Sequence, residues 1–326
     1  MFKLINKYRA FKTHKKAIFE EYQRQTERNY NDIRFYNWWS EENYSSLWLY
    51  QFVKNNGLCS TINKPINFCS VFGDREVLSL VNDGIKIFFS GENLHTPYWS
   101  QYADGLLEDK NCALSIGFDE FEDNRYLRFP LWLTYVFEPE LDEKKIRERC
   151  EQLRYPTIGY REKFACLVAR ADTSGVRTAM YEGLKGIERI DCPSELFHND
   201  ESLIEQFEDD KVKYMQQYLF NFCPENSNAD GYCTEKVFEA IAAGCIPVYW
   251  GSYNHPEEKI LNPNAIIFWD KDSDGSEAIH KIRELYEEPG KMKEFMRQPR
   301  LLPNAEEEII RMMNELKNRI SYLCQH

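Results

Sequence analysis

Short apolar runs that end in turn residues alternate with helical patterns along this chain, and this alternation is the feature that most constrains its fold. In the first half, residues 66–72 and Ile85–Phe89 are such runs, the first followed directly by Gly73 and the second, after one residue, by Gly91. Apolar runs of four to eight residues bounded by turns are typical of strands buried in parallel sheets. The alternation restarts after a turn-rich stretch at 155–159, with runs at 164–169, 219–223, 246–250 and 266–269. The pattern predicts two α/β domains with parallel sheets that face each other across a cleft.

The intervening segments have helical periodicity, and the expected helices are 40–54, 74–80, 142–154, 176–185, 234–243 and 277–287. From this order we expect four parts. They are a basic N-terminal arm over 1–28, a first Rossmann-like domain over 29–157, a second over 158–300, and a C-terminal helix over 301–326.

Composition excludes several classes of protein. The net charge of -12 argues against a nucleic-acid coat. The longest stretch without a charged residue, 240–256, is shorter than the roughly 20 apolar residues of a membrane helix and contains glycine and proline. We also expect no signal peptide. The ten cysteines are scattered and form no C-x-x-C pair, so we expect reduced, buried thiols in a cytoplasmic protein and no zinc site.

The first 28 residues differ in charge from the rest. They hold eight basic and three acidic residues, a net +5, which leaves -17 for the remainder. Aromatic and aliphatic residues between them indicate an amphipathic helix. Two interpretations stay open, a peripheral contact with an anionic membrane and a solvated helix packed on the first domain.

The most informative segment is 220–251, FNFCPENSNADGYCTEKVFEAIAAGCIPVYWG. Its pattern predicts a strand, a polar loop, a helix that begins near Thr234, and a second strand. A helix N-terminus presents free N–H groups and a partial positive charge, so Lys236 and Tyr232 beside it would form a phosphate site. Glu235 could accept hydrogen bonds from sugar hydroxyls. The alternative is an ordinary capped helix, with its glutamate placed to suit the helix dipole.

This segment resembles the signature of the bacterial α-1,3-fucosyltransferases, glycosyltransferase family 10. The matching elements are the Glu-Asn-Ser at 225–227, the Tyr-x-Thr-Glu-Lys at 232–236 and the Ile-Pro-Val-Tyr-Trp-Gly at 246–251. Further elements are similar to the family at 88–93, 116–119, 125–130 and 176–181.

The resemblance implies a GT-B fold of two Rossmann-like domains. It also implies an inverting transferase that moves L-fucose from GDP-fucose to a glycan hydroxyl, most commonly the 3-hydroxyl of N-acetylglucosamine. The donor would bind the C-terminal domain and an oligosaccharide or glycolipid acceptor the N-terminal one. No cofactor or metal is expected. The setting would be the synthesis of surface polysaccharide such as lipopolysaccharide with Lewis-type antigens.

Residue by residue, the resemblance implies that Glu92 is the general base for the acceptor hydroxyl. It implies that Arg177 and Lys236 neutralise the diphosphate of the departing GDP. Glu92 and Arg177 each have a structural alternative. Glu92 would stabilise the turn beside Gly91, and Arg177 would pair or cap at a helix start.

The remaining residues carried over by the resemblance concern the donor. Tyr232 matches a position that hydrogen-bonds the donor phosphate, and Asn226 matches a residue of the nucleotide pocket. Glu235 matches a residue that contacts the donor sugar, where its carboxylate could stabilise an oxocarbenium-like transition state. Two other functions stay open, a GT-B transferase for another nucleotide sugar or linkage and a catalytically silent nucleotide-sugar or glycan-binding module.

Overall fold

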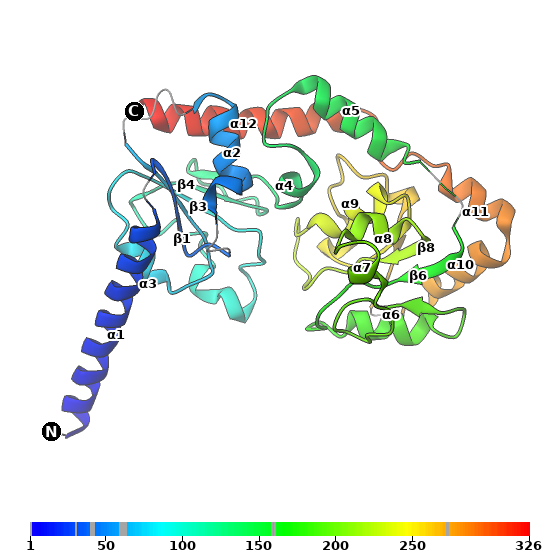
Figure 1. Cartoon of the computed structure of the whole chain (residues 1–326), viewed down its shortest axis with the longest axis horizontal. Helices are drawn as coiled ribbons and strands as arrows, with labels where there is room; N and C mark the ends of the chain where they lie inside the picture. The colour runs from blue at the N-terminus through cyan, green and yellow to red at the C-terminus, as the bar shows by residue number, and fades with distance from the viewer. Residues whose placement is uncertain are drawn as a thin grey trace. The chain divides into compact units, whose positions relative to one another are not determined.

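The computed structural model describes residues 2–29, 31–39, 43–58, 64–157, 159, 161–271 and 274–326. Within them, two five-stranded sheets, in which every pairing is parallel, confirm the predicted α/β class (Figure 1). The first sheet has the strand order β1-β2-β3-β4-β5. Its strands are β1 (Ile33–Tyr36), β2 (Ile66–Cys69), β3 (Ile85–Phe89), β4 (Cys112–Gly117) and β5 (Tyr126–Arg128).

The central strands of this sheet are buried along their length. All four residues of β2 and the last four of β3 are inaccessible, as expected for a parallel sheet covered on both faces. The helical elements of this half of the chain are α1 (Phe2–Arg28), η1 (Tyr44–Ser46), α2 (Trp48–Asn55), α3 (Arg75–Ser79), η3 (Pro97–Tyr102) and α4 (Trp132–Val136).

The second sheet has the order β10-β9-β8-β6-β7. Its strands are β6 (Lys163–Cys166), β7 (Ile190–Asp191), β8 (Tyr218–Phe222), β9 (Ile246–Tyr249) and β10 (Ile267–Phe268). The chain places β7 on one side of β6 and then returns to place β8 on the other. The strand order therefore reverses between β6 and β8, and in open parallel sheets a crevice forms at the carboxyl ends of the strands at such a point.

The helical elements of the second half are α5 (Glu143–Arg154), α6 (Val176–Leu184), α7 (Ser202–Glu205), α8 (Lys211–Met215), α9 (Glu235–Ala242), η4 (Ser252–Asn254), η5 (Pro263–Ala265), α10 (Ser276–Glu287), α11 (Pro289–Met296) and α12 (Ala305–Gln325). The core of this half lies between the sheet and α6, α10 and α11, where Trp269 and Met180 are buried.

The chain forms two compact units that are interleaved in sequence. The first comprises Met1–Phe129, Glu138–Leu141 and Met312–His326, and the second comprises Pro130–Phe137 and Asp142–Arg311. The segment with α4 thus belongs to the second unit, where the Trp132 ring stacks on Phe238 of α9. Its indole N–H donates to Glu257 at 2.9 Å.

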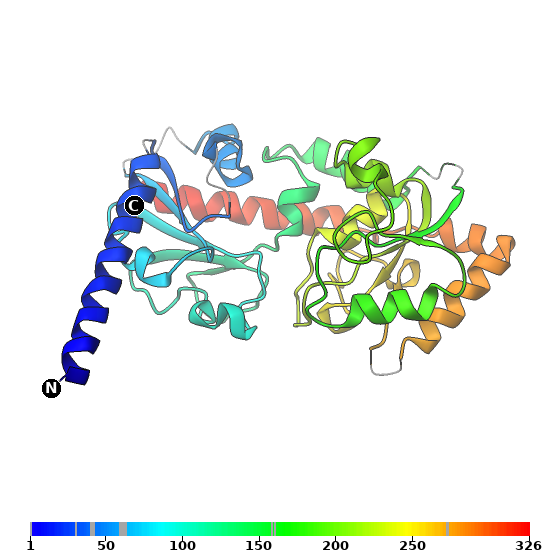
Figure 2. The same ribbon diagram turned by 60° about the horizontal axis from the view of Figure 1, so that its bottom comes forward.

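Among its described side chains, helix α1 buries apolar groups on the first unit from Ile18 onward. Ile18 is buried, whereas the described side chains from Asn6 to Ala17 are exposed, and Figure 2 shows α1 in dark blue reaching away from the strands of its unit. Lys15 pairs with Glu76 of α3 at 2.5 Å. The predicted helix is confirmed.

The predicted elements agree with the structure at most positions. The expected helix over 40–54 is shorter, because α2 begins at Trp48 after the separate turn η1; residues 40–42 lie outside the described residues. The pattern did not predict β1, β4, β5 or β7. Nine cysteines are free and buried, as predicted, and Cys59 lies outside the described residues. Across the described ranges, no helix is both long and apolar enough to span a membrane.

Candidate functional site

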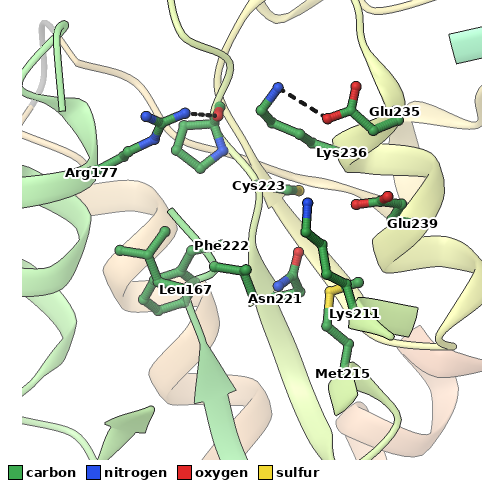
Figure 3. A pocket seen from close by; sticks show the side chains of 12 residues that line it. Leu167, Arg177, Lys211, Met215, Asn221, Phe222, Cys223, Glu235, Lys236 and Glu239 are labelled. Atoms are coloured by element: carbon green, nitrogen blue, oxygen red, sulfur yellow. Dashed lines mark hydrogen bonds and ion pairs between the residues drawn. The ribbon is translucent and has the colours of Figure 1, made fainter. Parts of the chain in front are cut away.

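A small hollow lies at the reversal point of the second sheet, at the carboxyl ends of β6 and β8 and the start of α9 (Figure 3). Its volume is about 50 Å³. It is lined by Leu167, Val168, Arg177, Lys211, Met215, Asn221, Phe222, Cys223, Pro224, Glu235, Lys236 and Glu239. Three of these side chains are basic and two are acidic. The lining of the hollow therefore has more basic than acidic side chains, although the chain as a whole is acidic.

The start of α9 is organised by a carboxylate from outside the helix. Thr234 occupies the N-cap position, but its side chain does not cap the helix. Its backbone N–H and its hydroxyl instead donate to the two carboxylate oxygens of Glu225, at 2.7 and 2.6 Å. Glu225 is fully buried and its own N–H donates to the Trp250 carbonyl at 2.8 Å. The loop after β8 is thereby tied both to α9 and to the end of β9.

Lys236 is held in place by the same carboxylate. Its ammonium lies 3.1 Å from Glu225, 2.7 Å from the Thr234 hydroxyl and 3.5 Å from Glu235. Burial alone would lower the pKa of Lys236, but the negative charges of Glu225 and Glu235 outweigh it and raise the pKa above its ordinary value. Lys236 is thus a fixed positive charge at neutral pH.

Arg177 is positioned by the start of α6. Gly175 precedes this helix with φ +78°, a conformation that favours glycine, and the Asp172 carboxylate accepts the N–H groups of Gly175 and Thr178 at 2.9 and 2.8 Å. The Arg177 side chain is almost fully buried, and it donates to the Asn226 amide oxygen at 2.7 Å and to the Pro224 carbonyl at 3.4 Å.

The Arg177 guanidinium is compensated by neutral oxygens. In the part of the chain that the structure describes, no carboxylate forms an ion pair with it. Burial lowers its pKa, because removing the cation from water is unfavourable. The carboxylates of Asp172 and Glu225 act on it electrostatically without forming an ion pair, so burial still outweighs them. A buried cation that is compensated this weakly has electrostatic capacity left for an anion.

Glu239 adds a titratable group on the next turn of α9. Burial, together with the negative charge of Glu235, raises the pKa of Glu239 to about 7. Lys211 and Lys236 act in the opposite direction. The charge of the hollow therefore changes near neutral pH.

The sequence-predicted donor residues come together here. Arg177 contacts Asn226 directly, and Glu235 and Lys236 are adjacent at the start of α9. Tyr232 is buried just before the helix. Their roles toward a ligand remain predictions.

Glu92 belongs to the first unit and is not part of this hollow. It follows β3, half-buried, and its N–H donates to the Ser90 hydroxyl at 3.1 Å. The Asn93 side chain accepts the His95 N–H at 3.1 Å. The turn is thus held by Ser90 and Asn93, and a carboxylate sits at the carboxyl end of a central strand.

Sequence reasoning missed Glu225 and Glu239 as members of the site. In the sequence Glu225 is only one residue of the Glu-Asn-Ser motif, and nothing in the local pattern indicates that it is buried against α9. Glu239 lies one helical turn after Glu235, which is a detectable spacing. Among the described residues, no group of three His, Cys, Asp or Glu side chains could hold a metal ion.

Two family profiles match the chain. The profile described as "Alpha-(1,3)-fucosyltransferase FucT N-terminal domain" matches residues 33–135. The profile described as "Glycosyltransferase family 10 (fucosyltransferase) C-term" matches residues 159–325, just over half of the chain. The second match includes the whole of the hollow.

The chain is also similar to known fucosyltransferases in sequence and in structure. The alpha-(1,3)-fucosyltransferase FucT of Helicobacter pylori is 27% identical over 289 residues, which cover 77% of this chain and 56% of that protein. This chain thus spans little more than half the length of that relative. Two crystal structures of α1,3-fucosyltransferase, one with GDP-fucose, are 21% and 22% identical, with TM-scores of 0.54 and 0.55. Each comparison covers 88% of this chain and 89% of the other. The likeness shows a shared GT-B fold.

Proposed function

The chain belongs to glycosyltransferase family 10, the fucosyltransferases, and from this premise we propose that it transfers L-fucose from GDP-fucose to a sugar hydroxyl. The observation that carries the proposal is the hollow at the reversal point of the second sheet, where Lys236 and Arg177 present two fixed cations. This is where open parallel sheets bind nucleotides.

The hollow suits the diphosphate part of the donor. Pockets that enclose whole small molecules measure roughly 300–1,000 Å³, so about 50 Å³ suits a phosphate group rather than a complete nucleotide sugar. Lys236 would contact the diphosphate as a point charge, and Arg177 would offer its guanidinium fork. Tyr232 and Asn226 would complete the donor contacts, and Glu235 would face the fucose.

The reaction we propose is a single displacement with inversion. The acceptor oxygen forms a bond to the anomeric carbon of fucose while the bond from that carbon to the β-phosphate oxygen breaks. The hydroxyl proton passes to the Glu92 carboxylate, and GDP leaves with the bonding electron pair. Negative charge grows on the diphosphate in the transition state, so Lys236 and Arg177 lower the barrier. Glu235 would stabilise the positive charge that develops on the sugar ring.

For the acceptor, we propose the 3-hydroxyl of N-acetylglucosamine in an N-acetyllactosamine-like oligosaccharide or glycolipid. Support comes from the family and from the H. pylori relative, which is described as an alpha-(1,3)-fucosyltransferase. Neither a metal ion nor a cofactor enters the proposed reaction, because side-chain cations perform the neutralisation.

We also propose that the enzyme works in the cytoplasm, in peripheral contact with an anionic membrane. Its buried free thiols are typical of a reducing compartment. Helix α1 supports the membrane contact, since Lys7, Arg9 and Lys16 lie on an exposed segment together with the half-exposed ring of Phe11.

A donor panel tests the proposal. Purified protein is incubated with GDP-fucose, GDP-mannose or UDP-galactose and an N-acetyllactosamine acceptor, and release of the nucleotide diphosphate is followed. We expect acceptor-dependent turnover with GDP-fucose only. Turnover with another donor would support a different GT-B transferase, and GDP-fucose binding without turnover on any acceptor would support a silent binding module.

A further inference from the structure

Exposed aromatic side chains gather at one edge of the first sheet. Trp39, Phe72 and Tyr98 are 45%, 40% and 80% exposed, and Trp99 is partly exposed. A contiguous exposed apolar patch commonly marks an interaction site, whereas single exposed apolar residues are ordinary. We call these four residues the aromatic platform.

The four rings form a continuous series of contacts. The Trp39 ring centroid lies 5.9 Å from that of Phe72, which lies 5.5 Å from that of Trp99. The Tyr98 and Trp99 centroids are 4.5 Å apart. Trp39 is also stacked on the buried Trp38 at 4.5 Å, so one end of the series is anchored in the core. The four rings thus form one contiguous aromatic surface.

The topology brings the aromatic platform to the same edge as Glu92. Trp39 follows β1 and Phe72 follows β2, while Glu92 follows β3. The carboxyl ends of these parallel strands lie at one edge of the sheet. Phe89, the last residue of β3, lies with its ring centroid 6.3 Å from that of Trp39.

Two basic residues close in sequence to members of the aromatic platform, Arg75 and His95, are each paired with a carboxylate. Arg75, beside the Tyr102 ring, forms a bidentate pair with Asp104, with one contact at 2.8 Å and the other at 2.5 Å. His95 contacts Asp119 at 2.6 Å. These pairs offer hydrogen-bonding groups but little net charge, so they complement a neutral, hydroxyl-rich partner better than a phosphate or an anionic lipid.

We propose that the aromatic platform binds the acceptor, with a pyranose ring of the oligosaccharide stacked on Trp39 or Phe72. One face of such a ring carries C–H groups, which are slightly positive and match the negative face of an aromatic ring. The hydroxyls at its rim meet the polar pairs. Bound in this way, the acceptor lies at the strand edge that carries Glu92. The inference rests on the proposed function, because it assigns the acceptor side of the same reaction.

The test measures saccharide binding without the reaction. N-acetyllactosamine is titrated into the wild-type protein and into the variants Trp39→Ala, Phe72→Ala and Tyr98→Ala by calorimetry. Tyr322→Ala, which removes an exposed aromatic ring from α12, is the matched control. Thermal melting identifies any variant that fails to fold. If Trp39→Ala does not fold, Trp39→Phe, which retains an aromatic face, is measured in its place.

We expect about tenfold weaker saccharide binding in at least the Trp39 and Phe72 variants, near-normal binding in Trp39→Phe and in the control, and unchanged affinity for GDP-fucose. In turnover assays the acceptor KM should rise by the same factor. If folded variants bind N-acetyllactosamine like the wild type, the proposal is overturned. It is also overturned if they lose only self-association or binding to phosphatidylglycerol vesicles. Failure of the proposed function has a different signature, since the wild type would then bind saccharide but not GDP-fucose.

Discussion

Glu225 is the residue on which the start of α9 depends, because its buried carboxylate receives two donors from Thr234 and one from Lys236. Such a buried pair contributes little net stability by itself, but removing one partner leaves the other uncompensated. Lys236 would then lose the larger of the two negative charges that raise its pKa, keeping only Glu235. A bound diphosphate can supply that charge instead.

We therefore expect Glu225→Gln to lower the free energy of unfolding by about 3 kcal/mol, measured in urea. GDP-fucose should raise the melting temperature of this variant by more than it raises that of the wild type. The exposed pair of Glu258 with His255 provides the control variant Glu258→Gln, which should behave like the wild type. Wild-type stability in Glu225→Gln would contradict this account of the helix start.

Glu92→Gln tests the proposed base. The amide keeps the size of the side chain but cannot accept the hydroxyl proton, so turnover should fall roughly 10²–10⁴-fold while GDP-fucose affinity stays near normal. Glu120→Gln, an exposed carboxylate of the same unit, should leave both quantities unchanged. Steady-state kinetics and calorimetry give the two readouts. Turnover close to that of the wild type would remove Glu92 from the base role.

Glu239 predicts a pH dependence. Its pKa of about 7 in the folded protein exceeds its ordinary value of 4.5, so the folded state binds the proton more tightly. Its effect on stability is therefore most favourable below pH 4.5 and is lost as the pH rises toward about 7. Protonation also removes a negative charge beside Lys211 and Lys236, so GDP-fucose should bind more tightly at pH 6 than at pH 8.

Glu239→Gln should remove most of this dependence. Calorimetric titrations with GDP-fucose at the two pH values measure it, because the diester has no phosphate group that titrates in this range. If GDP-fucose binding by Glu239→Gln depends on pH as steeply as in the wild type, the pH dependence arises from another group.

At the scale of elements, the ends of β8 and β9 are in close contact. Gly251, just after β9, lies against Glu225, which follows β8. Gly251 has φ +147°, and a Cβ atom there would lie 2.5 Å from Cγ of Glu225 and 2.9 Å from the Tyr249 hydroxyl. Glycine is thus required where the end of β9 passes the carboxylate that organises α9.

Gly251→Ala should consequently cost about 2–3 kcal/mol of stability and weaken GDP-fucose binding by displacing Glu225. Gly290→Ala in α11 is the matched control, because nothing lies within 4 Å of the added methyl group and alanine favours a helix. Urea unfolding compares the two. If Gly251→Ala is as stable as Gly290→Ala, the structure around Gly251 accommodates the added methyl group, and glycine is not required there.

The same scale shows what sequence reasoning could reach. Continuous apolar runs located β2, β3, β8 and β9, since both faces of these strands are buried. Short β5 and β7 carry too few residues for a pattern. For Thr234, the preference of threonine for helix starts predicted the N-cap position correctly. Its hydrogen bonds could not be predicted, because Glu225 reaches it only through tertiary packing.

For the whole molecule, charge is distributed unevenly between α1 and the remainder, +5 against -17 over the sequence. The pattern of strands and helices reveals two halves, but it contains no sign that the two compact units exchange segments at 130–141 and within α12. Charge asymmetry is a property of sequence and could be predicted, whereas the interleaving depends on packing.

The asymmetry predicts that α1 attaches the protein to anionic vesicles. Lys7→Glu combined with Lys16→Glu should weaken binding to phosphatidylglycerol vesicles at least about tenfold, because each basic residue near such a surface contributes about 1 kcal/mol. The matched control reverses Lys144 and Lys213, two exposed lysines on α5 and α8. Cosedimentation at low and high salt measures binding. Equal binding by both double variants would favour the solvated-helix interpretation.

The central claim is that the chain fucosylates a sugar hydroxyl with GDP-fucose as donor. The most direct measurement is NMR of the product formed from GDP-fucose and N-acetyllactosamine. We predict a single trisaccharide with fucose α-linked to the 3-hydroxyl of N-acetylglucosamine, with anomeric configuration inverted relative to the donor. Retention of configuration would contradict the single displacement, and absence of any fucosylated product across a panel of acceptors would contradict the claim itself.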